Sequence, residues 1–296
     1  MTPRMSPGQA VVCATLSLAA LAALAQPMRF GVDAELERDD NVPRGLLEED
    51  RRSDTIASLG ASAVHSTVLG PRSGLVLRGD ARYAHFADFQ DISALTLGGS
   101  ASYRVQPVVG FSAPWIEMLA DVRWLRHGDS DLRDGSIASL TASVGSHLTD
   151  RVRVSAGAGA SERSGGEPGL YDLSTTRVFA TLDYRAGIGT TLYGRVARIA
   201  GDHVFTAIDP TSQGYLADIY DVRAADPALA SGFNGTAPLA YRLEATSTVY
   251  DLGLNYPLGG TQAIDVSFTY YSAKPELDYR EYDGTQFRIS YLYRFQ

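Results

Sequence analysis

The chain has 296 residues, a formal net charge of −8 at pH 7 and one cysteine, Cys13. The acidic excess argues against a nucleic-acid-binding protein, because such proteins carry a basic surface. A single cysteine excludes a disulfide framework and a cysteine zinc site, so stability must come from packing and backbone pairing.

Residues 1–25 are predicted to be a secretory signal peptide, followed by a single domain over residues 26–296. Arg4 supplies a positive start, residues 10–24 are apolar, and Ala23-Leu24-Ala25 is a small-x-small cleavage site. The apolar run is shorter than the roughly 20 residues that span a membrane as a helix. No second long apolar run follows it, so a helical membrane protein is excluded.

Apolar and polar residues alternate with period two along almost the whole of the remaining chain. A strand sends successive side chains to opposite faces, so each such segment has one apolar and one polar face. Helical periodicity is almost absent, which argues against a parallel sheet with intervening helices. The predicted strands are about twelve, near residues 30–37, 57–63, 75–83, 95–105, 116–124, 138–144, 152–161, 177–185, 192–196, 241–256, 264–270 and 285–295.

The tenth of these segments, residues 241–256, changes its apolar parity near Val249 and Tyr250. A single extra residue in one strand reverses the faces of everything that follows it. The parity change therefore predicts a β-bulge at this point.

The last segment has Phe287, Ile289, Tyr291, Tyr293 and Phe295 on one face and charged or polar residues on the other. Its aromatic density is typical of a membrane–water boundary. The segment resembles the closing strand of bacterial outer-membrane β-barrels, whose final aromatic is read by the barrel-assembly machinery. This resemblance implies that Tyr291, Tyr293 and Phe295 form an assembly signal. We also expect periplasmic chaperones as partners, because unpaired strand edges are not tolerated in lipid.

Long and short connections alternate along the chain. The long ones are near residues 39–54, 85–93, 126–135, 162–175, 200–240 and 273–284, and the short ones near 69–74, 106–114, 149–151, 186–190 and 257–262. Short periplasmic turns and long extracellular loops are typical of outer-membrane barrels. With an even number of strands, this alternation predicts a Gram-negative outer-membrane protein with both termini in the periplasm.

These patterns predict an all-β fold, a transmembrane antiparallel up-and-down β-barrel of about 12 strands. The alternative is a secreted soluble sandwich or an eight-stranded calyx, with apolar residues inside and charges outside. The apolar face is rich in Ala and Gly, so it has too little side-chain volume for a good core but can lie against lipid tails. The membrane barrel is therefore favoured.

The polar faces of the predicted strands gather arginines and acids that are candidates for lining a pore. These candidates are Arg78, Arg82, Arg104, Arg123, Arg153, Arg177, Arg185, Arg195, Arg242, Arg288, Asp80, Asp121, Asp183, Glu244 and Asp265. One interpretation is a water-filled channel that attracts anions such as acidic sugars or phosphate. The other is that each arginine neutralises a neighbouring acid and props the lumen. The near balance of the two signs favours the second interpretation.

The predicted long loops hold most of the acidic excess and form a solvated outer rim that could bind divalent cations between lipopolysaccharide molecules. Loop 200–240 is the longest and carries enough apolar residues to fold over or into the mouth of the barrel. Loops of this length are usually functional or disordered. The sequence does not specify what this one does.

No enzymatic or metal chemistry is predicted, and no cofactor. No Gly-x-Ser-x-Gly motif occurs, and His85, the histidine nearest the outer rim, has no serine two residues away. His65 and His147 adjoin serines near the predicted periplasmic turns, and the remaining histidines lie in or beside loops. The histidines do not cluster in the manner of a metal site.

The opening stretch of residues 30–44 contains Asp39-Asp40-Asn41-Val42. It resembles the start of the β-barrel porin type 2 family, whose first strand often ends in Asp-x-Asn-Val. The resemblance implies an outer-membrane porin-like channel for small hydrophilic, including anionic, solutes. Because members of that family sometimes sit beside exopolysaccharide genes, a non-conducting accessory in exopolysaccharide or lipoprotein export is the alternative, as is a structural or adhesive barrel.

Overall fold

The computed structural model describes residues 27–166, 168–187, 189–208, 223–276 and 281–295. The predicted signal peptide lies outside the described residues, as do residues 209–222 of the predicted long loop. Within the described ranges, no helix is long and apolar enough to cross a membrane.

Strands make up most of the described chain. The first seven are β1 (Arg29–Asp39), β2 (Asp54–Gly70), β3 (Ser73–Phe86), β4 (Ala94–Val105), β5 (Trp115–His127), β6 (Gly135–His147) and β7 (Val152–Ser164). The others are β8 (Leu173–Ala186), β9 (Thr190–Ala207), β10 (Arg223–Ala225), β11 (Leu239–Pro257), β12 (Gln262–Pro275) and β13 (Tyr282–Arg294). In the described ranges, short 3₁₀ helices lie between them, namely η1 (Glu48–Asp50), η2 (Gln90–Ile92) and η4 (Pro227–Phe233).

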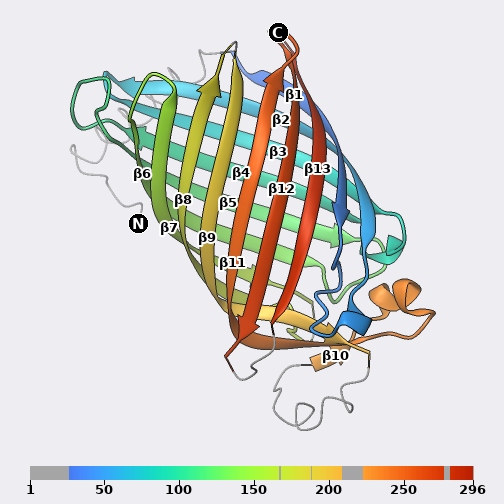
Figure 1. Cartoon of the computed structure of the whole chain (residues 1–296). Coiled ribbons are helices and arrows are strands. Elements are labelled where there is room, and N and C mark those ends of the chain that lie inside the picture. The colour runs from blue at the N-terminus through green and yellow to red at the C-terminus, as the bar shows by residue number, and fades with distance from the viewer. Residues whose placement is uncertain (1–26, 167, 188, 209–222, 277–280, 296) are drawn as a thin grey trace, which may run out of the picture.

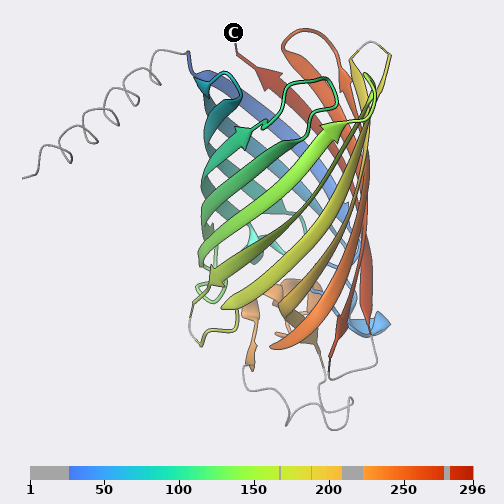
Figure 2. The same cartoon turned by 90° about the vertical axis from the view of Figure 1, so that its left-hand side faces the viewer.

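The sheet closes on itself through antiparallel neighbours. Consecutive strands pair from β1 to β9, β9 pairs with β11, and β13 returns to β1. Among the strands of the described chain, β10 pairs only with the end of β11, so twelve of these thirteen strands form the wall (Figures 1 and 2). The predicted twelve-stranded up-and-down barrel is therefore confirmed.

The two ends of the barrel differ as the connection lengths predicted. Connections 71–72, 106–114, 148–151, 187–189 and 258–261 lie at one end, called here the short-turn end. The described parts of connections 40–53, 87–93, 128–134, 165–172, 208–238 and 276–281 lie at the other, the long-loop end. The start of β1 and the finish of β13 pair at the short-turn end, where Gly31 is opposite Arg294.

The two faces of the wall have the polarity of a membrane-spanning barrel. Large apolar side chains point outward and stay exposed, for example Leu59 at 65 % and Leu252 at 64 %. Polar side chains of the other parity bond to one another across intervening strands, Arg82 to Asp33 and Tyr193 to Asp265, which is possible only on the concave side. The polar face is therefore the lumen, and the soluble calyx is excluded because its polarity is the reverse.

The predicted bulge at Val249 and Tyr250 is wrong. Strand β11 keeps one register with β9 from Leu239 opposite Ala207 to Asn255 opposite Thr191, without a shift. Apolar residues of β11 suggested the change of parity. Their side chains point inward because they belong to a packed region beyond the barrel wall. A register shift occurs instead between Val68 and Gly70, at the β2–β3 turn.

This packed region exists because β9 and β11 are longer than the wall requires, at 18 and 19 residues. A tilted membrane-spanning strand needs only about 9–11 residues. The surplus of the two strands runs across the long-loop end, where η4 and β10 also lie (Figure 1). We call this region the cap and define it as the ends of β9 and β11 with connections 40–53 and 87–93 and residues 223–238.

Candidate functional site

The lumen is lined by arginine–carboxylate pairs. The N–O distances are 3.5 Å for Arg78–Asp80, 2.5 Å for Arg82–Asp33, 2.9 Å for Arg123–Asp121, 2.5 Å for Arg153–Asp183 and 2.7 Å for Arg195–Asp251, and Arg104 pairs with Glu117. The carboxylates are mostly buried, whereas the arginine side chains keep about half of their surface exposed, as at Arg104 with 53 %. The guanidinium groups therefore face the open lumen.

One arginine crosses a neighbouring strand to reach its carboxylates, and a glycine makes room for the crossing. Arg82 on β3 reaches Asp33 and Glu35 on β1, at 2.5 and 3.2 Å, over β2. Gly60 lies beneath them on β2, and a Cβ there would come within 2.6 Å of the Asp33 carboxylate. Any larger residue at Gly60 must displace this charged bridge.

A second crossing joins β9 to β12. The Tyr193 hydroxyl donates to Asp265 Oδ1 at 2.8 Å, and Asn255 Nδ2 donates to Asp265 Oδ2 at 3.2 Å. Gly253 lies under the tyrosine ring, where a Cβ would meet Cζ at 2.2 Å. The predicted lumenal residue Asp265 is thus held by hydrogen bonds to neutral groups.

Two further predicted arginines occupy the lumenal parity with different partners. Arg288 donates to Ser267 at 3.1 Å and lies 3.8 Å from Glu35. Arg177 donates to the Thr141 hydroxyl at 2.9 Å. Arg185, near the short-turn end, lines a small cavity with Arg153 and Asp183.

Arg242 and Glu244 do not share the lumenal face with the other candidates. Without the bulge, they have the parity of Leu252, which is on the outer face. Arg242 donates to the backbone oxygens of Gly169 and Asp172, in the β7–β8 connection. The expectation that these two residues line the pore is therefore wrong for the physical reason given above.

Cavities occupy the lumen at several heights. One, of about 570 Å³, lies at the short-turn end between Arg29, Asp33, Arg78, Asn255 and Arg294. A second, about 530 Å³, is lined by Arg104, Gln106, Trp115 and His147 among others. A third, about 240 Å³, lies deeper between β6 and β9.

The Asp39-Asp40-Asn41-Val42 stretch anchors the cap to the wall. Asp39 accepts from Tyr271 at 2.9 Å and forms a 2.9 Å ion pair with Arg44. Buried Asn41 donates to the Gly45 and Asp283 backbone oxygens, each at 3.2 Å. These bonds turn connection 40–53 inward over the lumen.

Arg44 occupies a backbone conformation that few non-glycine residues adopt, with φ +62°. Its guanidinium lies 4.4 Å from the centre of the Tyr271 ring and bonds to Asp39. Burial by itself lowers the pKa of Arg44, but the Asp39 carboxylate outweighs it and holds the pKa above the ordinary value. Arg44 therefore stays charged and fixes the turn.

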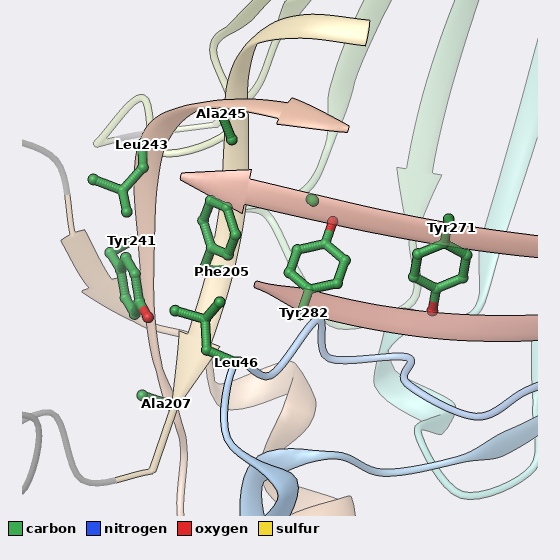
Figure 3. Packing of buried hydrophobic residues seen from close by; sticks show 9 residues of the cluster. Leu46, Phe205, Ala207, Tyr241, Leu243, Ala245, Tyr271 and Tyr282 are labelled. Carbon is green, nitrogen blue, oxygen red and sulfur yellow. The ribbon is translucent and has the colours of Figure 1, made fainter. Parts of the chain in front are cut away.

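The centre of the cap is an aromatic cluster. Phe205 from β9 stacks on Tyr241 from β11 at 6.0 Å and meets the edge of Tyr282 at 5.3 Å. Leu46, from the inward-turned connection, packs beside these rings (Figure 3). Phe205 and Tyr241 are almost completely buried, so the cap is a packed layer with the cohesion of a small core.

Two smaller clusters extend the cap to either side. Phe89, Ile92, Leu229 and Phe233 pack together where η2 meets η4. Fully buried Asp54 accepts hydrogen bonds from the backbone N–H groups of Asp88 and Phe89 nearby, at 3.0 to 3.1 Å.

On the other side, fully buried Asp226 pairs with Arg133 at 2.7 Å and accepts from the Tyr171 hydroxyl at 2.9 Å. Burial raises the pKa of Tyr171, so its hydroxyl remains a donor. Arg133 and Arg163 both lie against the Tyr171 ring, at 4.9 and 4.8 Å from its centre. Connections 128–134 and 165–172 are thereby tied to the cap.

The structure brings together two serine–histidine pairs that spacing along the chain could not reveal. His203 Nε2 lies 3.0 Å from Ser247 Oγ, with Nδ1 3.0 Å from the Gly201 oxygen, and His85 Nδ1 lies 3.4 Å from Ser93 Oγ. Ser247 and Ser93 are buried. Over the described ranges, no group of three or more His, Cys, Asp and Glu residues could hold a metal ion.

The predicted assembly residues lie on the outer face of the closing strand. Tyr291 pairs in register with Ala34 on β1 and Ile264 on β12, so it belongs to the seam that closes the barrel. The rings of Tyr293 and Phe295 meet edge to face at 5.0 Å, and Phe295 N–H donates to the Phe30 oxygen at 2.9 Å.

Comparison with known proteins places this fold among outer-membrane barrels. No protein-family model and no curated protein matches the sequence. Among solved structures, an outer membrane channel from Pseudomonas putida F1 has a TM-score of 0.57 at 11 % identity, over 92 % of this chain and 97 % of that one. The KdgM porin in complex with disordered oligogalacturonate has a TM-score of 0.49 at 11 % identity, over 90 % and 99 %. At this identity the first likeness shows the fold alone, and the fold is that of an outer-membrane barrel.

Proposed function

We propose that the chain forms a porin-like outer-membrane channel for small hydrophilic solutes, anions among them. The observation that supports this most is the lumen, whose arginine side chains are about half exposed and which contains several polar cavities. Fixed charges and hydroxyls can replace part of the hydration shell of a passing solute. A barrel whose lumen served only as a prop has no need of water-exposed guanidinium groups.

The proposed orientation places both termini and the short-turn end in the periplasm. The long-loop end, with the cap, then faces the outside, as is usual for such barrels. Residues of the outer rim such as Glu48, Glu49, Asp129 and Asp131 meet lipopolysaccharide there. Barrel-assembly machinery and periplasmic chaperones are the expected assembly partners, because the closing edges of β1 and β13 cannot remain unpaired in lipid.

The lumen also sets the expected selectivity. Because most lumenal arginines have a carboxylate within ion-pair distance, the field along the pore is weak and selectivity between simple ions is low. The cap narrows the outer mouth, so we expect a small conductance and a low size limit for solutes.

No catalytic role is proposed for the serine–histidine pairs. The orienting partner of His203 is a backbone oxygen, and Ser247 is buried beside the aromatic cluster of the cap. A nucleophile needs room for its substrate and donors for the developing oxyanion. Neither Ser247 nor Ser93 lines any of the lumenal cavities described above.

A non-conducting accessory of exopolysaccharide or lipoprotein export is the alternative function, supported by how much of the cap is packed. A structural or adhesive barrel is the other. Neither uses the exposed lumenal arginines.

Planar-bilayer recording of the refolded protein separates these functions. We expect stepwise currents from the full chain, and larger ones when residues 208–236 are replaced by a short Gly-Ser linker. A variant that shows the heat-modifiable gel shift of a folded barrel serves as the folding control. If both proteins fold and neither conducts, the channel proposal is wrong.

A further inference from the structure

One sector of the lumen lacks acids. From the mid-barrel level up to the row of Ser139, Ser161 and Thr175, the lumenal residues of β6, β7 and β8 are small, hydroxylated or apolar, with Arg177 as their one cation among the described residues. They are Ser139, Thr141, Ser143, Gly157, Gly159, Ser161, Thr175, Arg177 and Phe179. The next lumenal cation towards the cap is Arg163 of β7, which lies against the Tyr171 ring. Elsewhere the lumen alternates arginines with carboxylates, so this sector differs in charge from the rest of the wall.

Arg177 is held by neutral groups. Its Nη2 donates to the Thr141 hydroxyl at 2.9 Å, and its guanidinium carbon lies 5.4 Å from the centre of the Phe179 ring. Within the described ranges, no carboxylate forms an ion pair with it. The hydroxyl and the ring orient the guanidinium but leave its charge uncompensated, and four of its five donors are unused.

The charged lumenal groups on the flanking strands β5 and β9 are already paired at this level, and Arg163 of β7, towards the cap, adds a further positive charge. Asp121 on β5, in register with Ser139, is held by Arg123 at 2.9 Å. Arg195 on β9 is held by Asp251 at 2.7 Å. These pairs leave a local positive excess at Arg177.

Arg177 faces a lumenal cavity of about 240 Å³, which is also lined by the side chains of Ser139, Ser161 and Thr175. Strand register sets these three hydroxyl-bearing residues in one row, because Ser139 is opposite Ser161 and Ser161 is opposite Thr175. Arg177 lies in the next row, opposite Gly159. In the described structure, none of the three hydroxyls is hydrogen-bonded to another side chain.

We infer that this cavity binds a small oxyanion, a carboxylate or a phosphate, through the Arg177 guanidinium and the hydroxyls of Ser139, Ser161 and Thr175. A planar guanidinium with free donors matches two oxygens of such a group. Since a water occupies about 30 Å³ in the liquid, the cavity has room for the anion with part of its hydration shell. This inference rests on the proposed function, for which it supplies an anion-selective step beneath the cap.

Isothermal titration calorimetry of the folded protein in detergent tests the site with two probes, inorganic phosphate and glucuronate. Arg177→Gln should weaken binding about tenfold or more, the effect of losing a charge-assisted hydrogen-bonded contact. The affinity of Arg177→Lys should lie between those of the full chain and Arg177→Gln, because lysine keeps the charge but lacks the planar guanidinium. The two probes show whether phosphate, carboxylate or both are accepted.

Arg38→Gln is the matched control, since it removes one positive charge from the outer face of β1, away from the lumen and the cavity. It should leave phosphate and glucuronate binding within about twofold of the full chain. A heat-modifiable gel shift confirms that each variant is folded. If neither probe binds, or if Arg177→Gln binds as tightly as the full chain, the site is wrong.

Bilayer recording keeps the two proposals apart. In a conducting channel, millimolar phosphate should reduce the current of the full chain more than that of Arg177→Gln. Conductance with no Arg177-dependent binding overturns the oxyanion site and leaves the channel. Arg177-dependent binding without any current keeps the site and overturns the channel.

Discussion

Asp39 and Arg44 form a 2.9 Å ion pair at the point where the first strand leaves the wall and turns into the cap. The Asp39 carboxylate is nearly inaccessible and also accepts from Tyr271 and Gln286, at 2.9 and 2.8 Å. Two neighbouring strands are thereby tied to the first connection through one carboxylate. The wall itself does not depend on this group, because its backbone ladder continues on both sides.

Asp39→Asn should loosen the cap and leave the barrel closed. Removing one partner of a buried ion pair costs about 3–5 kcal/mol, and the partial exposure of Arg44 places the expected cost at the low end. Limited proteolysis of the refolded protein should then cut within residues 40–53. The exposed Asp129→Asn is the control and should stay resistant; equal resistance of the Asp39 variant would show that the pair does not hold the cap.

Gly253→Ala should destabilise the barrel, because its new Cβ collides with the Tyr193 ring at 2.2 Å. Overpacking of this kind costs about 1–3 kcal/mol. The unfolding midpoint in urea, measured in lipid vesicles, should fall. Gly259→Ala provides the control, since nothing lies within 4 Å of its Cβ.

The double variant Tyr193→Ala with Gly253→Ala isolates the collision. If the clash causes the loss of stability, Gly253→Ala should lower the free energy of unfolding much less in the Tyr193→Ala variant than in the natural sequence. Additive effects would mean that Gly253 matters for another reason.

The fold could be predicted from the sequence because one local rule, the alternation of side chains in a strand, applies to every strand of the wall. The lumenal pairs Arg123–Asp121 and Arg153–Asp183 obey the same rule and were within its reach. It failed at Arg242, where apolar Tyr241 and Leu243 face a packed cap. Alternation identifies an apolar face without showing whether lipid or protein covers it, and nothing local places Phe205 against Tyr282.

Replacing Arg82, Arg123 and Arg195 together by Gln should shift the ion selectivity of the channel towards cations. Each substitution leaves a lumenal carboxylate without its counter-charge, at Asp33, Asp121 and Asp251. The negative field that results concentrates cations in the pore. The reversal potential in a potassium chloride gradient measures the change.

The matched control for that triple variant is Arg38→Gln, on the outer face of β1, where Arg38 bonds to Thr55 and Ser53. It should leave the reversal potential unchanged. An unaltered potential in a folded, conducting triple variant would show that these arginines only prop the wall.

Leu59→Arg should impair folding into the membrane. Leu59 is 65 % exposed on the outer face of β2, between Ala34 and Tyr83 of the neighbouring strands. An arginine on the lipid face costs about 2–4 kcal/mol near the midplane and much less near the interfaces. Val109→Arg, in a short turn with 83 % exposure, is the control. Equal refolding yields of Leu59→Arg and Val109→Arg in lipid vesicles would contradict the proposed contact of Leu59 with lipid.

The closing strand allows its two expected roles, pairing and signalling, to be separated. Deleting residues 291–296 removes the pairing of Tyr291 with Ala34 and Ile264 and exposes both strand edges. That variant should fold neither in vesicles nor in cells, because lipid offers the strand edges no hydrogen-bonding partners.

The substitution Phe295→Ala keeps the backbone pairing of the closing strand, so this variant should refold in vesicles like the full chain. If Phe295 belongs to an assembly signal, the same substitution should reduce the amount of heat-modifiable barrel formed in cells, where assembly depends on the machinery. Normal assembly of Phe295→Ala in cells would leave the strand its pairing role and remove the signal.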